Sequence, residues 1–241
     1  MLAGEAHSLK TISASLPTFC PQTISQGTLP RGGAYLATSW LDMKKSPPKI
    51  SHAEFGNMVA AMHQITSPNA KFGFDCPTYC GLTEQDNTYM SSWIEFWKQR
   101  RLKPMLVNVK REHSQQRELL DMGFEVVEGC DRFFRNVDEI RPSLLHGDLW
   151  SGNWGYTTHP VVFDPASYYG HHEADLGIMR MFGGFSSDFY ESYHTHFPKE
   201  SGFERRLDLY ELYHALNHMY LFGSGYRSSC MALLRRLHAA L

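Results

Sequence analysis

The sequence predicts an α+β fold in which a few strands near the N-terminus are followed mainly by helices. A short run of bulky apolar residues over 34–41 follows a turn signal, which indicates a buried strand. Amphipathic helical patterns fill much of the remaining chain, and the longest covers 205–222. With 241 residues, of which 42% are hydrophobic, the chain is long enough to bury a sizeable core.

The first expected elements are a helix over 4–14 and the strand over 34–41. A proline-containing linker over 44–49 then separates two parts of the chain. We therefore expect a remnant of a small N-terminal lobe over 1–43 and a C-terminal lobe over 44–241.

The second part is expected to be mainly helical. A capping box at 51–54 predicts the start of its first helix. Further helical patterns cover 88–98, 111–122 and 205–222, while 144–163 is expected to form a loop and short strands. The aromatic and methionine stripes on these helices are expected to be core.

Composition excludes several classes of partner. The formal net charge is -2 and no block of like charges occurs, so we expect no nucleic-acid or membrane-surface partner. No apolar stretch reaches the length of a membrane helix, and the first residues do not resemble a signal peptide. The five scattered cysteines indicate reduced thiols, so we expect a cytoplasmic protein.

The chemistry is concentrated in one loop. Asp148 and Asn153 have the spacing of kinase catalytic loops, in which the aspartate orients the attacking hydroxyl and the asparagine binds magnesium. Gly147 and Gly152 give this loop the freedom to aim both side chains at one phosphate. The loop therefore predicts phosphoryl transfer.

A second acidic residue strengthens this prediction. Asp164 follows the apolar run 160–163, and a strand there would hold its carboxylate against a metal ion. Mg²⁺ prefers hard oxygen ligands and takes only one or two from protein carboxylates. A single loop aspartate is usually a turn or cap residue. The combination with Asp148 and Asn153 favours a catalytic site.

The same residues carry a resemblance to a known family. The strings 145–153 and 164–171 closely resemble the fructosamine-3-kinase family, which includes ketosamine and ribulosamine 3-kinases. The shorter strings 173–176, 181–185 and 216–218 are also similar to it. The resemblance implies a protein-kinase-like fold with two lobes. It also implies ATP-dependent phosphorylation of the 3-hydroxyl of a ketoamine, on glycated proteins or small amines, as part of protein deglycation and repair.

The resemblance implies roles for the loop residues. Asp148 would be the catalytic base for the sugar hydroxyl, and the Mg²⁺ of the ATP complex would be bound by Asn153 and Asp164. Trp150 would stack on the sugar. His146 would brace the loop by hydrogen bonding.

Further roles follow from the neighbouring strings. Asp175 resembles the residue that ties down the backbone of the catalytic loop. His171 and Glu173 are candidate substrate contacts because they lie in a matching string.

The nucleotide side is expected to involve the N-terminal part. By resemblance, the backbone at the hinge between the lobes would meet adenine, and Glu5 would be the helix glutamate that pairs with a nucleotide-binding lysine. The hinge residues are Ser39, Trp40 and Leu41.

One departure from the family pattern concerns this lysine. In the kinase-like fold, a glycine-rich loop and a strand lysine precede the glutamate helix. Gly32 and Gly33 follow that helix and lack the required spacing, and Lys10 lies on the helix itself. We therefore expect a truncated N-terminal lobe with exposed apolar surface and weakened ATP binding.

Two alternative functions stay open at this stage. The departure allows a catalytically impaired, pseudokinase-like binding module. The His-Gly-Asp core at 146–148 is shared with aminoglycoside and choline kinases, so a related small-molecule kinase is the other alternative.

Overall fold

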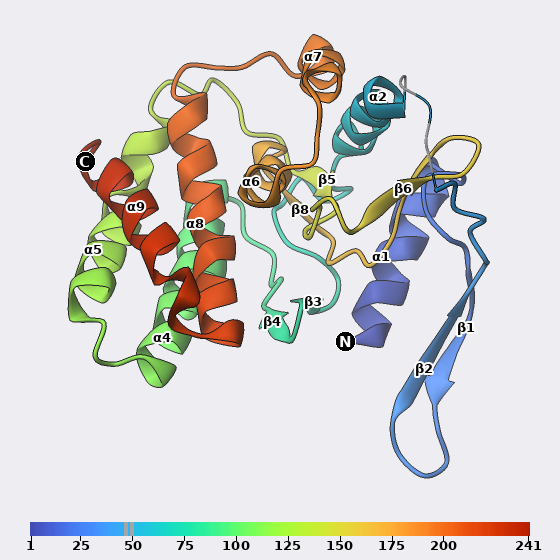
Figure 1. Ribbon diagram of the computed structural model, residues 1–241, viewed down its shortest axis with the longest axis horizontal. Helices are drawn as coiled ribbons and strands as arrows, with labels where there is room; N and C mark the ends of the chain where they lie inside the picture. Colours follow the sequence, from blue (N-terminus) through green and yellow to red (C-terminus); the bar gives the residue numbers. More distant parts are fainter. Residues whose placement is uncertain (46–47, 49–50) are drawn as a thin grey trace.

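The computed structural model describes residues 1–45, 48 and 51–241, and it has two parts of unequal size (Figure 1). A helix and a long hairpin lie on one side, and a mainly helical body lies on the other. The expected linker falls largely on 46–47 and 49–50, which lie outside the described residues. Lys44 N, next to the expected boundary, donates to the Tyr156 carbonyl oxygen at 2.7 Å, so the chain contacts the helical body at this point. The division between 43 and 44 stays a prediction.

The N-terminal part consists of helix α1 (Leu2–Ser15) and strands β1 (Thr23–Thr28) and β2 (Ala34–Thr38). The strands pair antiparallel, and their hairpin projects away from the body (Figure 1). Gly32 and Gly33 have φ values of 88° and 91° at the hairpin turn, where a residue with a Cβ would be strained.

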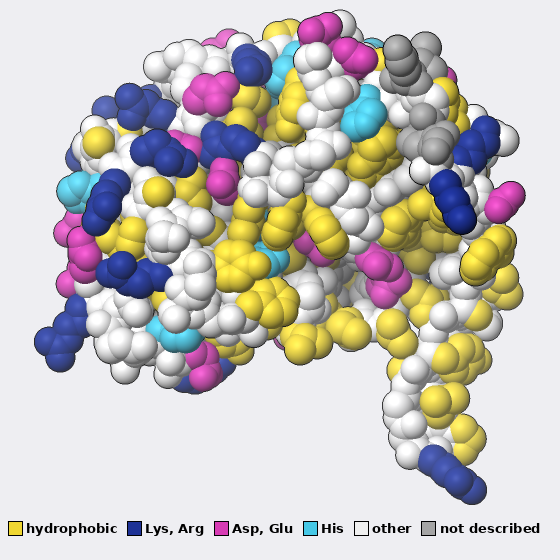
Figure 2. All heavy atoms as spheres, viewed as in Figure 1, with side chains coloured by type: hydrophobic (Ala, Val, Ile, Leu, Met, Phe, Trp, Pro, Cys, Tyr) yellow, Lys and Arg dark blue, Asp and Glu magenta, His cyan; other side chains and the backbone are white. Residues whose placement is uncertain are grey.

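This hairpin is rich in exposed apolar side chains. Tyr35 is 42% exposed and Trp40, just beyond β2, is 90% exposed. Figure 2 shows hydrophobic side chains along much of its length. The expectation of exposed apolar surface is therefore confirmed. The expectation of a buried strand over 34–41 was wrong, because among the described residues β2 pairs with β1 alone and has no buried residue.

The body is built from helices with short strand pairs between them. The α-helices are α2 (Ser51–His63), α3 (Trp93–Trp97), α4 (Lys103–Glu112), α5 (Arg117–Glu128), α6 (Glu173–Phe182), α7 (Ser187–His196), α8 (Phe203–Phe222) and α9 (Arg227–His238). The other helical turns are the π-helix η1 (Lys98–Leu102) and the 3-10 helices η2 (Cys130–Phe134) and η3 (Ser224–Tyr226). The strands are β3 (Thr78–Cys80), β4 (Thr83–Gln85), β5 (Ser143–Leu145), β6 (Trp154–Tyr156), β7 (Pro160–Val162) and β8 (Tyr168–Gly170). They form the antiparallel pairs β3–β4, β5–β8 and β6–β7.

Helix α8 organises the core of the body. It packs against α4, α6 and α9, and its buried residues include Tyr210 and Tyr213. The expected helix over 205–222 is thus confirmed, and its stripe of large apolar residues is core, as predicted. The edge of the Trp97 ring system meets Tyr210 at 4.8 Å between centroids, a favourable arrangement for two aromatic side chains.

Two other helices differ from the prediction at their ends. The pattern over 88–98 becomes helical only at Trp93, because Thr88 N and Oγ1 donate to the Asp86 carboxylate and hold that segment in a turn. The pattern over 111–122 contains the end of α4 and the start of α5, with a break between them. Helix α2 begins at Ser51 itself, so the position before it, where a cap would lie, is outside the described residues.

Two simpler expectations concern the membrane and the cysteines. No helix in the described residues is long and apolar enough to cross a membrane. All five cysteines are free thiols, as expected.

Candidate active site

The predicted catalytic loop connects β5 to β6 and is fixed by its neighbours. Gly147 has a φ of 85°, and a Cβ at this position would collide with the Ala166 carbonyl oxygen. Ala166 is itself hydrogen-bonded to the loop, since Ala166 N donates to His146 O at 2.8 Å. Only glycine fits here, so the tight turn that sequence analysis inferred is real.

Asp175 holds the start of the loop by its backbone. This carboxylate, in the first turn of α6, accepts from His146 N at 2.7 Å and from Gly147 N at 2.8 Å. His63 Nε2 lies 3.1 Å from it, and His63 Nδ1 lies 2.8 Å from the Tyr193 hydroxyl. Burial opposes ionisation of Asp175, but the hydrogen bonds from His63 and from the loop backbone lower its pKa overall. The two backbone hydrogen bonds are of the kind that the resemblance implies for Asp175.

His146 braces the loop from inside. Its Nδ1 accepts from Asp148 N at 3.3 Å, so its other nitrogen, Nε2, carries the proton and donates to Phe163 O at 3.0 Å. Burial lowers the pKa of His146, which keeps the ring neutral and preserves this arrangement. The hydrogen bonds expected of His146 are present.

Asp148 and Asn153 face each other across the loop. The Asn153 amide donates to the Asp148 backbone oxygen at 2.9 Å and to its Oδ2 at 3.3 Å. The other carboxylate oxygen, Oδ1, lies 3.5 Å from the Cys80 sulfur. Burial raises the pKa of Asp148 to about 6, although the hydrogen bonds from Cys80 and Asn153 act in the opposite direction. Such a carboxylate is matched to accepting a proton near neutral pH.

Asp164 lies at the edge of the same cavity. It follows β7, as predicted, and has a φ of 55°, a left-handed conformation that aspartate tolerates better than most residues. The preceding residue, Phe163, donates its N–H to Asn153 O at 3.1 Å, which ties this turn to the catalytic loop. Glu5 lines this cavity together with Asp164, and burial and the Asp164 charge both raise the pKa of Glu5.

These groups line one cavity of about 320 Å³, which we call the acidic pocket. Its lining residues are Met1, Glu5, Tyr79, Gly81, Asp148, Trp150, Asn153, Asp164 and Pro165. The structure thus brings together the predicted base, both predicted metal ligands and the predicted helix glutamate. No lysine or arginine is among these described lining residues.

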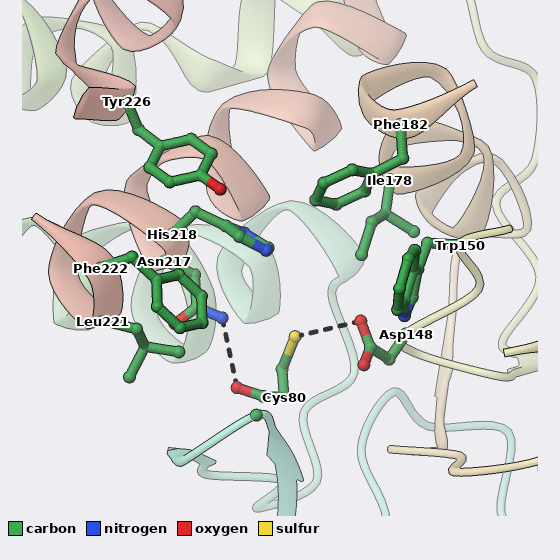
Figure 3. Close-up of a pocket in the computed structure, with 11 residues that line it drawn as sticks. Cys80, Asp148, Trp150, Ile178, Phe182, Asn217, His218, Leu221, Phe222 and Tyr226 are labelled. Atoms are coloured by element: carbon green, nitrogen blue, oxygen red, sulfur yellow. Dashed lines mark hydrogen bonds between the residues drawn. The ribbon is translucent and has the colours of Figure 1, made fainter. Parts of the chain in front are cut away.

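A second cavity, of about 330 Å³, adjoins the first and contains several aromatic side chains (Figure 3). We call it the aromatic pocket; it is lined by Cys80, Gly81, Asp148, Trp150, Ile178, Phe182, Asn217, His218, Leu221, Phe222 and Tyr226. Trp150 is 37% exposed, and its ring lies 5.3 Å from that of Phe182. Asp148 and Trp150 line both cavities, so the carboxylate lies between an acidic and an aromatic pocket.

The structure places His171 and Glu173, the predicted substrate residues, away from both pockets. Both are buried and line neither pocket. His171 Nδ1 lies 2.7 Å from the Tyr210 hydroxyl, and both oxygens of Glu173 accept from Arg206, at 2.7 and 2.8 Å. Glu173 thus joins α6 to α8, and His171 joins the segment before α6 to α8.

The expected hinge residues are also outside the two pockets. Ser39 continues the hairpin, since its N–H donates to Gln22 O at 2.8 Å and its hydroxyl accepts from Gln22 N at 2.9 Å. Trp40 and Leu41 follow it, and none of the three lines either cavity. Their contact with adenine stays a prediction.

Several pocket residues were missed because they come from distant segments. Cys80 ends β3, and Asn217 on α8 donates to its carbonyl oxygen at 3.2 Å (Figure 3). Phe182 and His218 lie in strings that resembled the family, and that likeness was the available signal for them. For Cys80 the sequence offered only its pairing with Cys76, which has no second cysteine pair at zinc spacing to accompany it.

Fold and loop together define a phosphotransferase of the protein-kinase-like class. A solved choline/ethanolamine kinase family protein from Mesorhizobium loti shares the fold, with a TM-score of 0.59 at 15% identity over 99% of this chain and 79% of that one. At this identity the likeness concerns the fold alone.

The family is defined by closer matches. The family model described as fructosamine kinase matches residues 1–240, and the chain belongs to this family. It is 41% identical to a chloroplastic protein-ribulosamine 3-kinase of Arabidopsis thaliana, over 97% of this chain and 71% of the relative. It is 38% identical to a ketosamine-3-kinase of Mus musculus, over 98% of this chain and 83% of the relative. A solved protein from Thermobifida fusca, assigned as a fructosamine-3-kinase, has a TM-score of 0.86 at 29% identity, over 98% of this chain and 80% of that one.

Proposed function

We propose that this protein transfers the γ-phosphoryl group of ATP to the 3-hydroxyl of a ketoamine, on a glycated protein or a small amine. The observation that carries this proposal is the position of Asp148 between the acidic and the aromatic pocket. The names of the relatives, ribulosamine and ketosamine 3-kinases, supply the substrate class. The expected role is repair of glycated proteins, with the cytoplasm as the expected compartment.

The acidic pocket is the proposed site for the phosphates and Mg²⁺. The Asn153 amide nitrogen donates to Asp148, and no hydrogen bond to the Asn153 amide oxygen is found among the described residues. That oxygen and the exposed Asp164 carboxylate are hard ligands of the kind that Mg²⁺ prefers, so the donor set fits the ion. Bound there, Mg²⁺ would neutralise charge on the phosphates. Because no cationic side chain lines the described pocket, we expect ATP binding to depend strongly on the ion.

The aromatic pocket is the proposed site for the ketoamine. Trp150 offers a flat apolar face beside Asp148, which suits the apolar face of a sugar. In the reaction, the sugar 3-oxygen bonds to the γ-phosphorus, the bond from this phosphorus to the bridging oxygen of ADP breaks, and the hydroxyl proton moves to an Asp148 oxygen. Asp175 and His146 act only through the loop backbone, by fixing where Asp148 points.

A substrate panel tests the proposal. The protein is incubated with Mg-ATP and a fructosyl amine, a ribulosyl amine, choline or an aminoglycoside, and products are detected by the mass of an added phosphate. We expect product only with the ketoamines and a loss of at least about 100-fold in rate for D148N. Product with choline or the aminoglycoside alone would support the small-molecule alternative. Nucleotide binding by calorimetry without product would support the impaired module.

A further inference from the structure

Three potential metal ligands meet beside the aromatic pocket, and two of them, Cys80 and Asp148, line it. They are Cys80 at the end of β3, Asp148 in the catalytic loop and His214 on α8. The Cys80 sulfur lies 3.5 Å from Asp148 Oδ1 and 3.9 Å from His214 Nδ1, and all three ligand atoms lie within 4.8 Å of one another. One sulfur, one nitrogen and one carboxylate oxygen therefore surround a single point.

These separations are close to those of a tetrahedral zinc centre. Zn–S bonds of about 2.3 Å and Zn–N or Zn–O bonds of about 2.0 Å place neighbouring ligand atoms about 3.3 to 3.6 Å apart. The observed separations at Cys80 are near this range, so small side-chain movements suffice. The thiol contacts that an ion would replace are long and weak, since both involve sulfur at 3.5 Å or more.

The charges and the access route also suit a divalent ion. A thiolate and a carboxylate together balance a charge of two, and a neutral imidazole adds none, so the occupied site is neutral overall. Cys80 and His214 are 2% and 4% exposed, which favours a neutral centre over separated charges. Cys80 and Asp148 line the pocket (Figure 3), which gives the ion a path in and gives room for a fourth ligand.

The other group of potential ligands in the described residues lacks these properties. It consists of His171, His172 and Glu173. Both Glu173 oxygens are held by Arg206, and His171 is paired with the Tyr210 hydroxyl. A metal there would have to displace strong buried hydrogen bonds and leave a guanidinium unpaired.

We propose that Zn²⁺ binds Cys80, Asp148 and His214 and that this binding inhibits phosphoryl transfer. The ion displaces the thiol proton to solvent and takes the Asp148 carboxylate, which then cannot accept the sugar hydroxyl proton. Mg²⁺ does not compete for this site, because it prefers an all-oxygen shell and thiolates favour softer ions. The inhibition, but not the binding, rests on the proposed function.

Cobalt provides a direct test of binding. Co²⁺ is titrated into the wild-type protein, C80S, H214N and the control C76S, and thiolate-to-cobalt absorption is recorded. Cys76 is a suitable control because it is more accessible than Cys80 but is not in the cluster. We expect one cobalt with a thiolate band in wild type and C76S, no band in C80S, and at least tenfold weaker binding in H214N. Melting curves verify that each variant is folded. A band that persists in C80S or disappears in C76S overturns the site.

The kinase assay tests the consequence of binding. Each protein's rate with a saturating ketoamine is compared with and without Zn²⁺, relative to its own zinc-free rate and in excess Mg²⁺. We expect Zn²⁺ to reduce the wild-type and C76S rates at least tenfold at concentrations that leave C80S within twofold of its own rate. Equal inhibition of C80S overturns the proposal. A protein with no ketoamine product at all contradicts the proposed function and the inhibition, while the cobalt spectra still decide the site.

Discussion

Replacing the proposed base should abolish activity while stabilising the fold. Asp148→Asn keeps the size of the side chain but removes a carboxylate whose ionisation is opposed by burial. The folded protein holds the Asp148 proton more tightly than the unfolded chain, so ionisation of this group favours unfolding. The free-energy cost of ionising Asp148 in the folded protein is absent below the pKa of the unfolded chain. It grows as the pH rises towards the pKa of the folded protein and is complete above that value.

The size of the stability change in D148N follows from the pKa shift of Asp148. The pKa of Asp148 rises from 3.8 to about 6, and each unit corresponds to about 1.4 kcal/mol, so the full cost is about 3 kcal/mol. At pH 5 the cost is about 1.6 kcal/mol, so the stability gained by D148N should grow by about 1.4 kcal/mol between pH 5 and pH 8. For a chain of this length that increase corresponds to about 3 to 6 °C in melting temperature.

Thermal unfolding of wild type and D148N at several pH values tests this reasoning. The difference in melting temperature should widen from pH 5 to pH 8. Asp164→Asn is the matched control for the loss of a carboxylate from the same pocket, because Asp164 is exposed. A D148N difference that is constant over this range, or that shrinks as the pH rises, would refute the claim that burial dominates at Asp148.

Three further predictions concern the supports of the loop and the core. Asp175→Asn weakens two charge-assisted hydrogen bonds to the loop backbone, so kcat should fall at least about tenfold, in a kinetic assay, with a smaller change in KM. Gly147→Ala forces a collision and a strained φ, and circular dichroism should show a loss of folded protein or a melting temperature lowered by several degrees. Arg206→Met leaves the Glu173 carboxylate buried without its guanidinium partner, so the free energy of unfolding, measured with denaturant, should fall by about 3 to 5 kcal/mol. The double variant R206M/E173Q should recover part of that free energy.

The catalytic loop was predictable because its signal is local. Asp148, Asn153 and Asp164 lie within one short segment, and the chemistry of phosphoryl transfer restricts their spacing. Gly147 likewise marked the tight turn correctly. Asp175 was placed by family resemblance, and its two hydrogen bonds agree with that placement.

Other features depended on contacts that the sequence does not display. His171 and Glu173 lie in a family-like string, yet a string does not show which side chains point into the core. The partner of Glu173, Arg206, lies on a helix that is more than thirty residues further along the chain. Cys80 and His214 are more than a hundred residues apart and meet only through the packing of β3 against α8. The raised pKa of Asp148 is also a consequence of burial, which the loop sequence does not encode.

The hairpin illustrates the same limit for secondary structure. The run over 34–41 is apolar enough to suggest burial, but every residue of β2 is exposed or only partly buried. Periodicity and composition predict an element, whereas burial depends on which partners pack against it.

The central claim is that Asp148 lies between a metal–phosphate site and a sugar site, and relaxation measurements with Mn²⁺ in place of Mg²⁺ test it most directly. A fructosyl amine labelled with ¹³C is bound together with Mn-ADP, and the paramagnetic relaxation of each sugar carbon is compared. We predict that relaxation is strongest near C3 and is lost in D164A. Uniform relaxation along the sugar, or the strongest effect at the far end of the sugar, would contradict the arrangement.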